Sequence, residues 1–510
     1  MRRLDGEKPN ILLITTDQQH WNTIHALGNP AIRTPNLDRL AREGVAFRRA
    51  YVTSPVCSPS RSTMITGEYP SRHGCWQVGV ALDPGRPTIG RILSGHGYAT
   101  GLFGKAHFQP CEEGSFESPP HIHDRAFWRG FRGPYYGFET VAMGHGHGDS
   151  PFAHGMHYGV WLEEQGIDPM DYFLPGKDNA WGEPWALPEQ YHYTRWTADR
   201  TMEFMEKRAG RGPFFAWCSF QDPHDKFLCP EPWASMYDPD SLPPFRESPD
   251  ESAGKPAVYR YLLEGRIFDF PREQLPPDAE PLIRGQMQCL LFTNDSIGRS
   301  EARKWLAAYY GMISLIDHHV GRLLDKLEEL GIADRTLVVF TSDHGDYAGN
   351  HNLWLKGPLH YEDIIRVPFL ARWSGRLPEG VQTDALFSMA DLAPTLLEAF
   401  GLPPAPHMQG VSQWRTMLNP ETPSRGWCLV ENRVHPDYYV KTIVTDRFKM
   451  NYVLNREADG ELYDLREDPD EFRNVYGHPD YAGVRMRLLE KLVDAYGRLE
   501  NPYPPRTCFA

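Results

Sequence analysis

The chain has 510 residues and a formal net charge of −14, with 41% hydrophobic and 24% charged residues. This composition is ordinary for a globular protein and excludes a disordered or fibrous chain. The length exceeds what one hydrophobic core usually supports, so we expect a large domain and a smaller one. The net negative charge argues against nucleic acid or an anionic membrane as a partner, because binding either one requires a basic face on the protein.

The N-terminal segment has an apolar run at residues 11–14, which is too short for the core of a signal peptide or for a membrane-spanning helix. We therefore expect a cytoplasmic protein that begins at Met1. Eight cysteines are scattered along the chain without a Cys-x-x-Cys pair, which argues against a disulfide framework or a zinc cluster. By default, each cysteine is a reduced, small and mostly buried side chain.

The first predicted element is a strand in the apolar stretch NILLITTDQQ, residues 10–19. A helix follows it, because Thr34 can act as its N-cap, Pro35 suits its first position and Gly44 can end it. A second helical pattern begins at Pro59. The chain therefore opens with an alternation of strand and helix.

Three further apolar runs predict strands at residues 98–108, 212–225 and 335–346, and apolar residues at helical spacing predict a long helix over residues 304–331. Runs that are apolar throughout are typical of strands buried in a mostly parallel sheet. We predict an α/β domain with a large, mostly parallel or mixed central sheet flanked by helices. Ligands of such sheets bind at the carboxyl ends of the strands, so the residues after each run are candidates.

Two stretches inside the predicted catalytic domain, residues 1–405, have no clear period. Residues 110–188 are rich in Gly, His, Pro and aromatic residues, and residues 222–281 are rich in proline. Long irregular insertions in a compact domain are usually functional or disordered. Residues 406–510 alternate apolar and polar positions, which predicts a smaller α+β subdomain with an antiparallel sheet, a helix and a tail. The apolar, proline-rich tail suits contact with a neighbouring subunit, so a homo-oligomer is one expected assembly.

Oxygen-rich pairs follow two of the predicted strands. Asp17-Gln18 ends the first run and Asp343-His344 ends the fourth, so the pairs share one sheet edge if both strands point the same way. Two carboxylates, an amide oxygen and an imidazole form a reasonable site for a divalent cation. Oxygen ligands favour calcium or magnesium, whereas the imidazole moves the preference toward manganese. The alternative is that the aspartates only cap helices or turns.

Cys57 lies just before a predicted helix, where backbone N–H groups and the helix dipole favour negative charge. One interpretation is a nucleophile with a low pKa, whose histidine base would come from elsewhere in the fold. The other is an inert, buried thiol. The position of Cys57 alone does not distinguish these two interpretations.

Cys57 begins the sequence CSPSR, which is followed by STMITGEYPSRHG. Other short motifs occur along the chain, in this order: ITTDQQ at 14–19, before Cys57, and then GKAHF at 104–108, Pro223-His224, TSDHGD at 341–346, LWLKGP at 353–358 and GELYDLREDPDEFRNV at 460–475. Together they resemble the motifs of the sulfatase family, in whose Cys-x-Pro-x-Arg signature the cysteine is oxidised to formylglycine after translation. The resemblance spans nearly the whole chain.

The resemblance implies an alkaline phosphatase-like fold and a role for each matching residue. One divalent metal ion, calcium or manganese ahead of magnesium, would be bound by Asp17, Gln18, Asp343, His344 and the formylglycine made from Cys57. The anion and the nucleophile would be surrounded by Arg61, Lys105 and Lys356. His107 would contact the hydroxyl of the nucleophile, and His224 would lie on the leaving-group side. The implied partners are a small anionic ester as substrate and a formylglycine-generating enzyme during maturation.

A formylglycine hydrate offers two hydroxyls on one carbon. One hydroxyl would attack the sulfur and displace the alcohol, with His224 as the general acid. Deprotonation of the second hydroxyl, for which His107 is the candidate, would expel sulfate and restore the aldehyde. The leaving group is left open, since an aryl, a sugar and a small alkyl sulfate all suit the aromatic and histidine-rich insertion. Its histidines are assigned to the pocket wall or the surface: His145, His147, His154 and His157.

Two positions depart from the commonest sulfatase pattern. Gln18 stands where many sulfatases have an aspartate, and His344 where many have an asparagine; both resemble the phosphonate monoester hydrolases, a neighbouring formylglycine-using branch. Lys105 and His107, in contrast, are typical of true sulfatases and would touch the transferred group. We therefore predict an arylsulfatase-like hydrolase that also cleaves phosphonate monoesters or phosphodiesters. The alternatives are a phosphonate monoester hydrolase or phosphodiesterase, and a metal-binding homologue without activity.

Overall fold

The computed structural model describes residues 8–500, apart from residues 112–113, 174–179, 253, 257–258, 260–291 and 436–437. The predicted tail contact therefore lies outside the described residues, as do residues 260–281 of the proline-rich insertion. Across the described part of the chain, no helix combines the length and the apolar character needed to cross a membrane.

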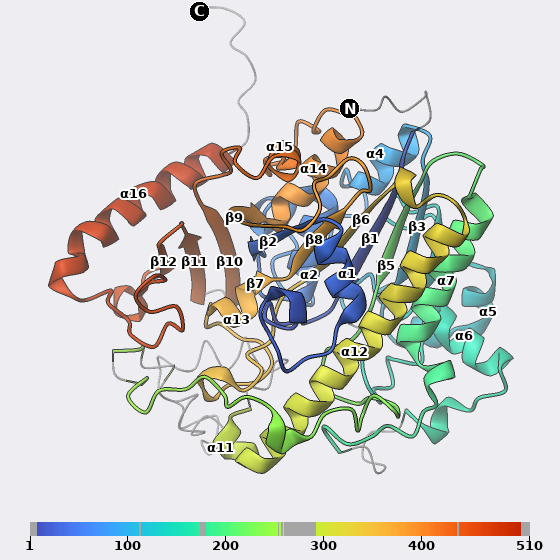
Figure 1. Ribbon diagram of the computed structural model, residues 1–510, viewed down its shortest axis with the longest axis horizontal. Helices are drawn as coiled ribbons and strands as arrows, with labels where there is room; N and C mark the ends of the chain where they lie inside the picture. The colour runs from blue at the N-terminus through green and yellow to red at the C-terminus, as the bar shows by residue number, and fades with distance from the viewer. Residues whose placement is uncertain are drawn as a thin grey trace, which may run out of the picture.

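A large central sheet organises the molecule (Figure 1). Nine strands of the described chain form it, in the order β4-β3-β5-β1-β6-β8-β2-β7, with β9 also pairing with β2. Their bounds are β1 Asn10–Thr16, β2 Val45–Tyr51, β3 Ala99–Gly104, β4 Thr140–Met143, β5 Phe214–Ser219, β6 Thr336–Ser342, β7 Arg366–Val367, β8 Phe369–Arg372 and β9 Val381–Ser388. Strands β4, β3, β5, β1 and β6 run parallel, whereas β8 is antiparallel to both of its neighbours. The predicted mostly parallel, mixed sheet is confirmed.

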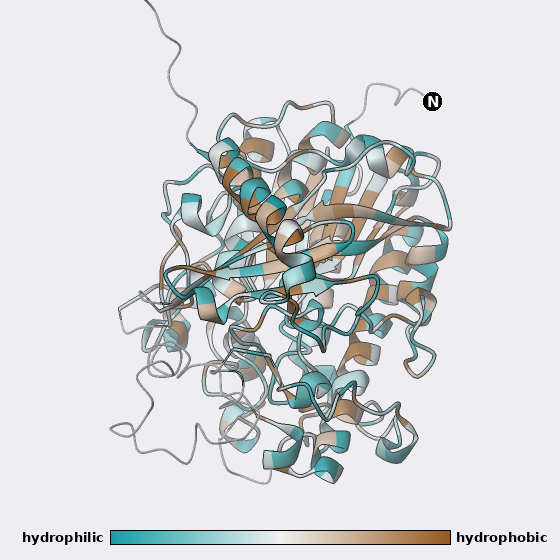
Figure 2. Ribbon diagram, turned by 90° about the vertical axis from the view of Figure 1, so that its left-hand side faces the viewer, coloured by the Kyte–Doolittle hydropathy of each residue, from teal (hydrophilic) through white to brown (hydrophobic). Residues whose placement is uncertain are grey.

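Helices cover both faces of this sheet, which explains why its strands are apolar throughout. Along β1, Leu12 and Ile14 pack on one side and Ile11 and Leu13 on the other. The first side is covered by α1 Pro35–Arg42, α7 Tyr193–Arg208 and α12 Arg299–Glu329, and the second by α2 Cys57–Thr66, α4 Ile89–Gly95 and α14 Leu392–Ala399. Figure 2 shows hydrophobic residues running through the strands between these layers. The helices predicted after Thr34 and over residues 304–331 are confirmed as α1 and α12.

The first predicted insertion is less irregular than its composition suggests. Residues 140–143 form β4, which pairs in parallel with β3 at the edge of the central sheet, and two helices flank this strand. The strand was missed because it is short and is followed at once by glycines and histidines. The other α-helices are α3 Pro70–His73, α5 Arg125–Gly130, α6 Met156–Glu164, α11 Asn294–Ile297, α13 Glu362–Ile365, α15 Trp414–Leu418 and α16 Ala482–Leu499.

The predicted C-terminal antiparallel sheet is also confirmed. In the described chain it has four strands: β10 Cys428–His435, β11 Tyr438–Val444, β12 Phe448–Val453 and β13 Glu461–Asp464. Helix α16 covers it, with Leu488 and Leu492 in one cluster with Ile443 and Met450. The backbone N–H of Glu431 donates to the carbonyl of Thr53, so this sheet is hydrogen-bonded to the segment that leads into α2.

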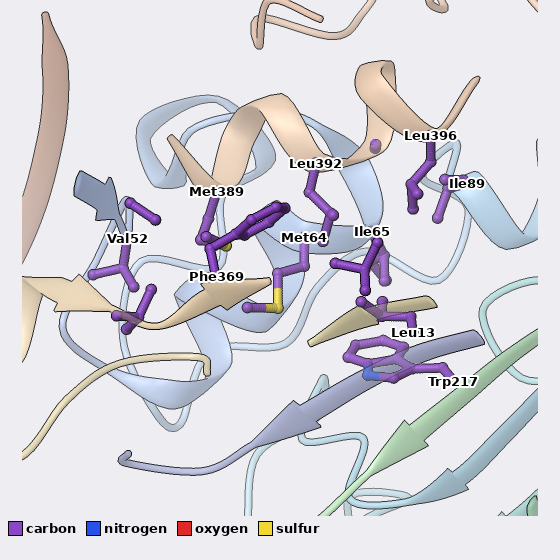
Figure 3. Close-up of a cluster of buried hydrophobic side chains, with 14 of the residues drawn as sticks. Leu13, Val52, Met64, Ile65, Ile89, Trp217, Phe369, Met389, Leu392 and Leu396 are labelled. Atoms are coloured by element: carbon purple, nitrogen blue, oxygen red, sulfur yellow. The ribbon is translucent and has the colours of Figure 1, made fainter. Parts of the chain in front are cut away.

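Helix α2 is buried along its whole length. Figure 3 shows Met64 and Ile65 of this helix lying between Leu392 of α14 and the sheet residues Leu13 and Trp217. Close packing on both sides fixes the helix relative to the sheet. The side chains at its N-terminal end are therefore held in one position.

We expect Ile65→Ala to lower the free energy of unfolding by about 2–5 kcal/mol, because the smaller side chain leaves a cavity between α14 and the sheet. Ile65 is only 1% exposed. Urea denaturation measures the change. Val493→Ala on α16 is the control, since Val493 is 71% exposed and should change little. An equal, small effect in both variants would mean that this packing does not hold α2.

Candidate active site

The ends of β1 and β6 bring the two oxygen-rich pairs together. Thr16 and Ser342 are partners in the parallel register of these strands, so the next residues leave the sheet at the same edge. The backbone N–H of Gln18 donates to Asp343 Oδ1 at 3.0 Å, and the N–H of Asp343 donates to the Thr16 carbonyl at 3.2 Å. The shared edge follows from strand direction, as expected of a parallel sheet.

Cys57 joins this group from the first position of α2. Its Sγ lies 3.1 Å from His344 Nε2 and 3.6 Å from Asp17 Oδ1. The ligand atoms of Asp17, Cys57, Asp343 and His344 all lie within 4.8 Å of one another, and all four residues are buried. Two carboxylates and an imidazole that converge in this way fit a divalent cation such as manganese or calcium.

Gln18 presents its amide oxygen to the same site. Its Nε2 donates to Asp346 Oδ2 at 2.7 Å, and its Oε1 accepts a hydrogen bond from Lys356 Nζ at 2.9 Å. Its backbone is in the left-handed region, with φ of 68°, a conformation that few residues other than glycine adopt without strain. Asp346, which we did not single out from the sequence, therefore orients the amide. The only sequence signal was its place in the TSDHGD motif.

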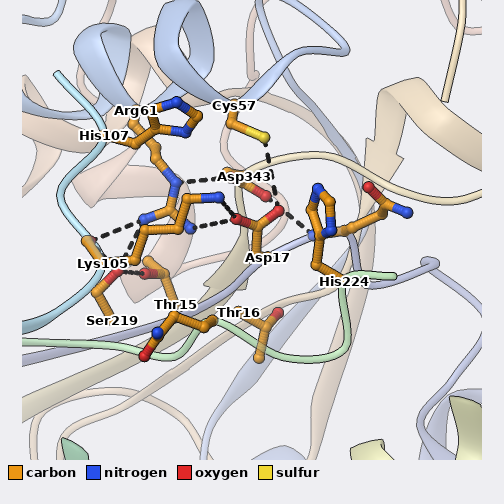
Figure 4. Close-up of polar contacts among 12 residues, drawn as sticks. Thr15, Thr16, Asp17, Cys57, Arg61, Lys105, His107, Ser219, His224 and Asp343 are labelled. Atoms are coloured by element: carbon orange, nitrogen blue, oxygen red, sulfur yellow. Dashed lines mark hydrogen bonds and ion pairs between the residues drawn. The ribbon is translucent and has the colours of Figure 1, made fainter. Parts of the chain in front are cut away.

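Two cations, Arg61 and Lys105, contact the carboxylates (Figure 4), and a third, Lys356, lies beside Cys57. Arg61 donates through Nε to Asp343 Oδ2 at 2.7 Å and lies 3.4 Å from Asp17 Oδ2 through Nη2. Lys105 pairs with Asp17, and Lys356 Nζ lies 3.1 Å from Cys57 Sγ. The side chains of Arg61 and Lys105 are fully buried. An acidic chain thus concentrates positive charge around one side chain.

This charge acts on the Cys57 thiol. Burial alone would raise its pKa, but Lys105, Lys356 and His344 together hold the pKa well below the usual value of a cysteine. The pKa of Asp17 is also lowered, although burial and Cys57 oppose this, because Lys105, His224 and Arg61 stabilise the carboxylate. A negative oxygen or sulfur at the position of Cys57 is therefore stabilised by the surrounding protein.

The two predicted catalytic histidines have opposite pKa shifts. Burial and the nearby Lys105 lower the pKa of His107 to about 4, so its imidazole is neutral at pH 7. Burial would also lower the pKa of His224, but the carboxylate of Asp225, with Oδ1 at 2.8 Å from Nδ1, raises the pKa to about 9. Shifts that separate two titratable groups in this way are typical of acid and base partners.

His147, predicted only for the pocket wall or the surface, lies against two of the candidate site residues. Its ring stacks on His224 with centroids 3.6 Å apart, and its Nε2 lies 2.9 Å from Lys105 Nζ. His157 is structural instead, because its Nδ1 accepts the backbone N–H of Met143 at 2.9 Å. No spacing in the histidine-rich stretch distinguishes these two roles.

Comparison with known proteins adds to this geometry. A family model described as Sulfatase matches residues 9–402, and one for the C-terminal region of N-sulphoglucosamine sulphohydrolase matches residues 349–497. An arylsulfatase of Clostridium perfringens (strain 13 / Type A) is 29% identical over 497 residues, which cover 95% of this chain and 94% of that protein. A protein of Trinickia caryophylli, named multifunctional alkaline phosphatase superfamily protein PehA, is 29% identical over 519 residues, covering 95% of this chain and 94% of its own. The crystal structure of a phosphonate monoester hydrolase of Agrobacterium radiobacter has a TM-score of 0.75 at 25% identity and covers 97% of this chain and 96% of that one.

Proposed function

This chain belongs to the sulfatase family and is a hydrolase of that family, and from that premise we propose that it hydrolyses sulfate esters of the arylsulfatase type through a formylglycine made from Cys57. The observation that carries the proposal is the surroundings of Cys57. Its buried Sγ lies 3.1 Å from Lys356 Nζ and 3.1 Å from His344 Nε2. Conversion by a formylglycine-generating enzyme is part of the proposal.

The proposed metal ion would be held by Asp17, Asp343 and His344, whose ligand atoms converge with Cys57, together with Gln18 and the formylglycine made from Cys57. When bound, a divalent cation supplies Lewis-acid chemistry to the sulfate oxygens and to a hydroxyl of the nucleophile. Arg61 contacts both carboxylates, so it holds the buried acidic pair in position. The formylglycine hydrate supplies two hydroxyls on one carbon, one for attack and one whose deprotonation releases sulfate.

The remaining side chains would move protons and stabilise charge. Protonated His224 would give a proton from Nε2 to the departing alcohol oxygen, and neutral His107 would accept one from the second hydroxyl. Lys105 and Lys356 would stabilise the transferred anion as charge develops on its oxygens. The pKa shifts of the two histidines support these roles, since the pKa of His107 is lowered to about 4 and that of His224 is raised to about 9.

Phosphonate monoester or phosphodiester hydrolysis is the second candidate. It is supported by the Gln18 and His344 ligands and by the likeness to a phosphonate monoester hydrolase. The two candidates are separated by kcat/KM for an aryl sulfate and an aryl phosphonate monoester with the same leaving group, on one preparation supplied with manganese or calcium. A higher kcat/KM for the sulfate would support our proposal. A higher kcat/KM for the phosphonate would mean that Gln18 and His344, rather than Lys105 and His107, indicate the substrate. If protein whose Cys57 has been converted to formylglycine hydrolyses neither ester, the chain would be an inactive homologue.

We expect kcat/KM to fall as the pH rises through about 9, because His224 must be protonated to act as the general acid. The carboxylate of Asp225 raises the pKa of His224, so Asp225→Asn should move this alkaline limb to lower pH. The pH profiles of the two proteins, measured on one substrate, test the shift. Asp149→Asn is a control, because Asp149 is a buried carboxylate that pairs with Lys226. If the alkaline limb of the pH profile is unchanged in Asp225→Asn, His224 is not the general acid.

A further inference from the structure

A second group of metal-binding side chains lies beside the active site: His107, Cys111 and His145. Cys111 Sγ is 3.0 Å from His145 Nε2 and 3.9 Å from His107 Nε2. The three ligand atoms all lie within 4.8 Å of one another. The two histidines are buried, with 7% and 3% exposed, and Cys111 is half-buried. We infer that these three side chains form a second metal site, selective for Zn²⁺ or a similarly soft divalent cation.

The distances fit tetrahedral zinc. Bonds of about 2.3 Å to sulfur and about 2.0–2.1 Å to nitrogen, at a tetrahedral angle, place the two ligand atoms about 3.5 Å apart. The separations of Cys111 Sγ from His145 Nε2 and His107 Nε2, 3.0 and 3.9 Å, lie on either side of this value. The two imidazole rings meet edge to face, with centroids 5.1 Å apart and an angle of 85°. Small side-chain movements would therefore complete three coordination positions and leave a fourth for water.

Glu117 supplies the outer carboxylate that such sites commonly have. Its Oε2 lies 3.5 Å from His145 Nδ1 and accepts the backbone N–H of His107 at 2.8 Å. Histidine ligands of zinc usually donate their second N–H to a carboxylate, which fixes the ring. Within the described residues, the Nδ1 atoms of His107 and His145 are both buried and have no hydrogen-bond partner. Glu117 therefore holds the backbone of His107 and lies close enough to His145 Nδ1 to accept its N–H after a small movement, while the Nε2 atoms of both histidines face Cys111.

The two metal sites differ in chemistry. The Asp17 and Asp343 site is rich in oxygen, whereas one thiolate with two imidazoles is a set that prefers zinc over calcium, magnesium or manganese. Zinc binding would release the Cys111 thiol proton to solvent. One protein would thus bind a hard cation and a soft one next to each other.

The shared residue His107 links the second site to the proposed reaction. A cation on Nε2 confines the ring proton of the neutral imidazole to Nδ1, so His107 can no longer accept a proton. Zinc at this site should therefore inhibit hydrolysis. Only this consequence rests on the proposed function, because binding of the cation does not depend on it.

Binding is tested with Co²⁺ and Zn²⁺ on the purified protein. Co²⁺ should produce a thiolate charge-transfer band that persists in Cys57→Ser, which lacks the other nearby thiol, and is lost in Cys111→Ser. Zn²⁺ affinity, from competition with a chromophoric chelator, should fall in Cys111→Ser and His145→Ala by at least the ~10–100-fold that loss of an outer partner costs. A band lost in Cys57→Ser and kept in Cys111→Ser, or an unchanged affinity in both variants, would overturn the site.

Inhibition is measured separately, as the ratio of rates with and without free Zn²⁺ at saturating manganese, within each variant. At the same free Zn²⁺ concentration, this ratio should be at least ~10-fold lower for the wild type than for Cys111→Ser. Equal inhibition of both proteins would overturn the link through His107, even where the Co²⁺ band supports the site. Absence of hydrolysis in every preparation would count against the proposed function and would leave the binding result standing on its own.

Discussion

Cys57→Ala is expected to lower kcat/KM for any ester that the protein hydrolyses by about 10⁴–10⁶-fold, the range typical of removing a covalent nucleophile. The surrounding cations would remain, so the residual rate would report binding and charge stabilisation alone. Cys218→Ala is the matched control. Cys218 is equally buried, but it lies in β5 among side chains packed on the α7 and α12 side, and burial raises the pKa of its thiol to about 12. We expect its activity to stay within a few-fold of wild type.

Cys57→Ser separates the formylglycine mechanism from an ordinary hydroxyl nucleophile. A serine has one hydroxyl, so it can form a sulfate ester with the substrate but cannot expel sulfate by breaking its own C–O bond. We expect one turnover at most, followed by a stable sulfated peptide. Mass spectrometry of the tryptic peptide, residues 50–61, detects it. The same peptide from active wild-type protein should be lighter than the thiol form; a purely thiol mass there would contradict the proposal.

The core of the site could be predicted because strand direction alone determines it. Apolar runs buried on both faces indicate parallel strands, and parallel strands place the residues after them at one edge. Asp17 and Asp343 are separated by more than 300 positions, yet they contact the same Arg61. Cys57 could be placed near them only through the family resemblance, since nothing in its own helix pattern indicates which strand ends it faces.

The outer parts of the site could not be predicted, because they depend on the path of loops. His147 reaches Lys105 and His224 from a stretch without helical or strand periodicity. Glu117 holds the turn at His107 with carboxylate-to-backbone hydrogen bonds, which leave no sequence pattern. The spacing of Cys111 and His145 matches no common ligand motif, and the scattered cysteines without a Cys-x-x-Cys pair argued against a zinc cluster. Tertiary contacts between loops decide these positions.

Removing the divalent cation is expected to lower kcat/KM by about 10³-fold or more, since a Lewis acid at the reacting group is worth several kcal/mol. The reason lies in the ligand set, in which the buried carboxylates of Asp17 and Asp343 and the imidazole of His344 converge. Chelation followed by dialysis, and then return of manganese or calcium, measures the loss and its recovery. Full activity in protein shown by elemental analysis to be metal-free would contradict a catalytic cation.

Cation binding should also stabilise the fold, because the ligands are brought together only in the native state. At a free concentration 100 times Kd, the expected gain is about 2.7 kcal/mol, visible as a rise in Tm. His344→Gln should need a higher cation concentration for the same rise. His360→Gln is the matched control, since His360 is also buried but interacts through Nδ1 with Thr442 Oγ1 at 2.7 Å. Equal responses of the two variants would exclude His344 as a ligand.

His344→Asn tests why this chain has an imidazole at that position. Nitrogen ligands favour manganese over calcium, whereas an amide oxygen suits calcium. The ratio of activity with manganese to activity with calcium should therefore fall in His344→Asn relative to wild type, even if both activities decrease. Because Arg61 holds Asp343 and Asp17 independently of His344, the remaining ligands should keep their places. An unchanged ratio would mean that the carboxylates and Gln18 set the metal preference, and that the imidazole serves the nucleophile at Cys57 instead.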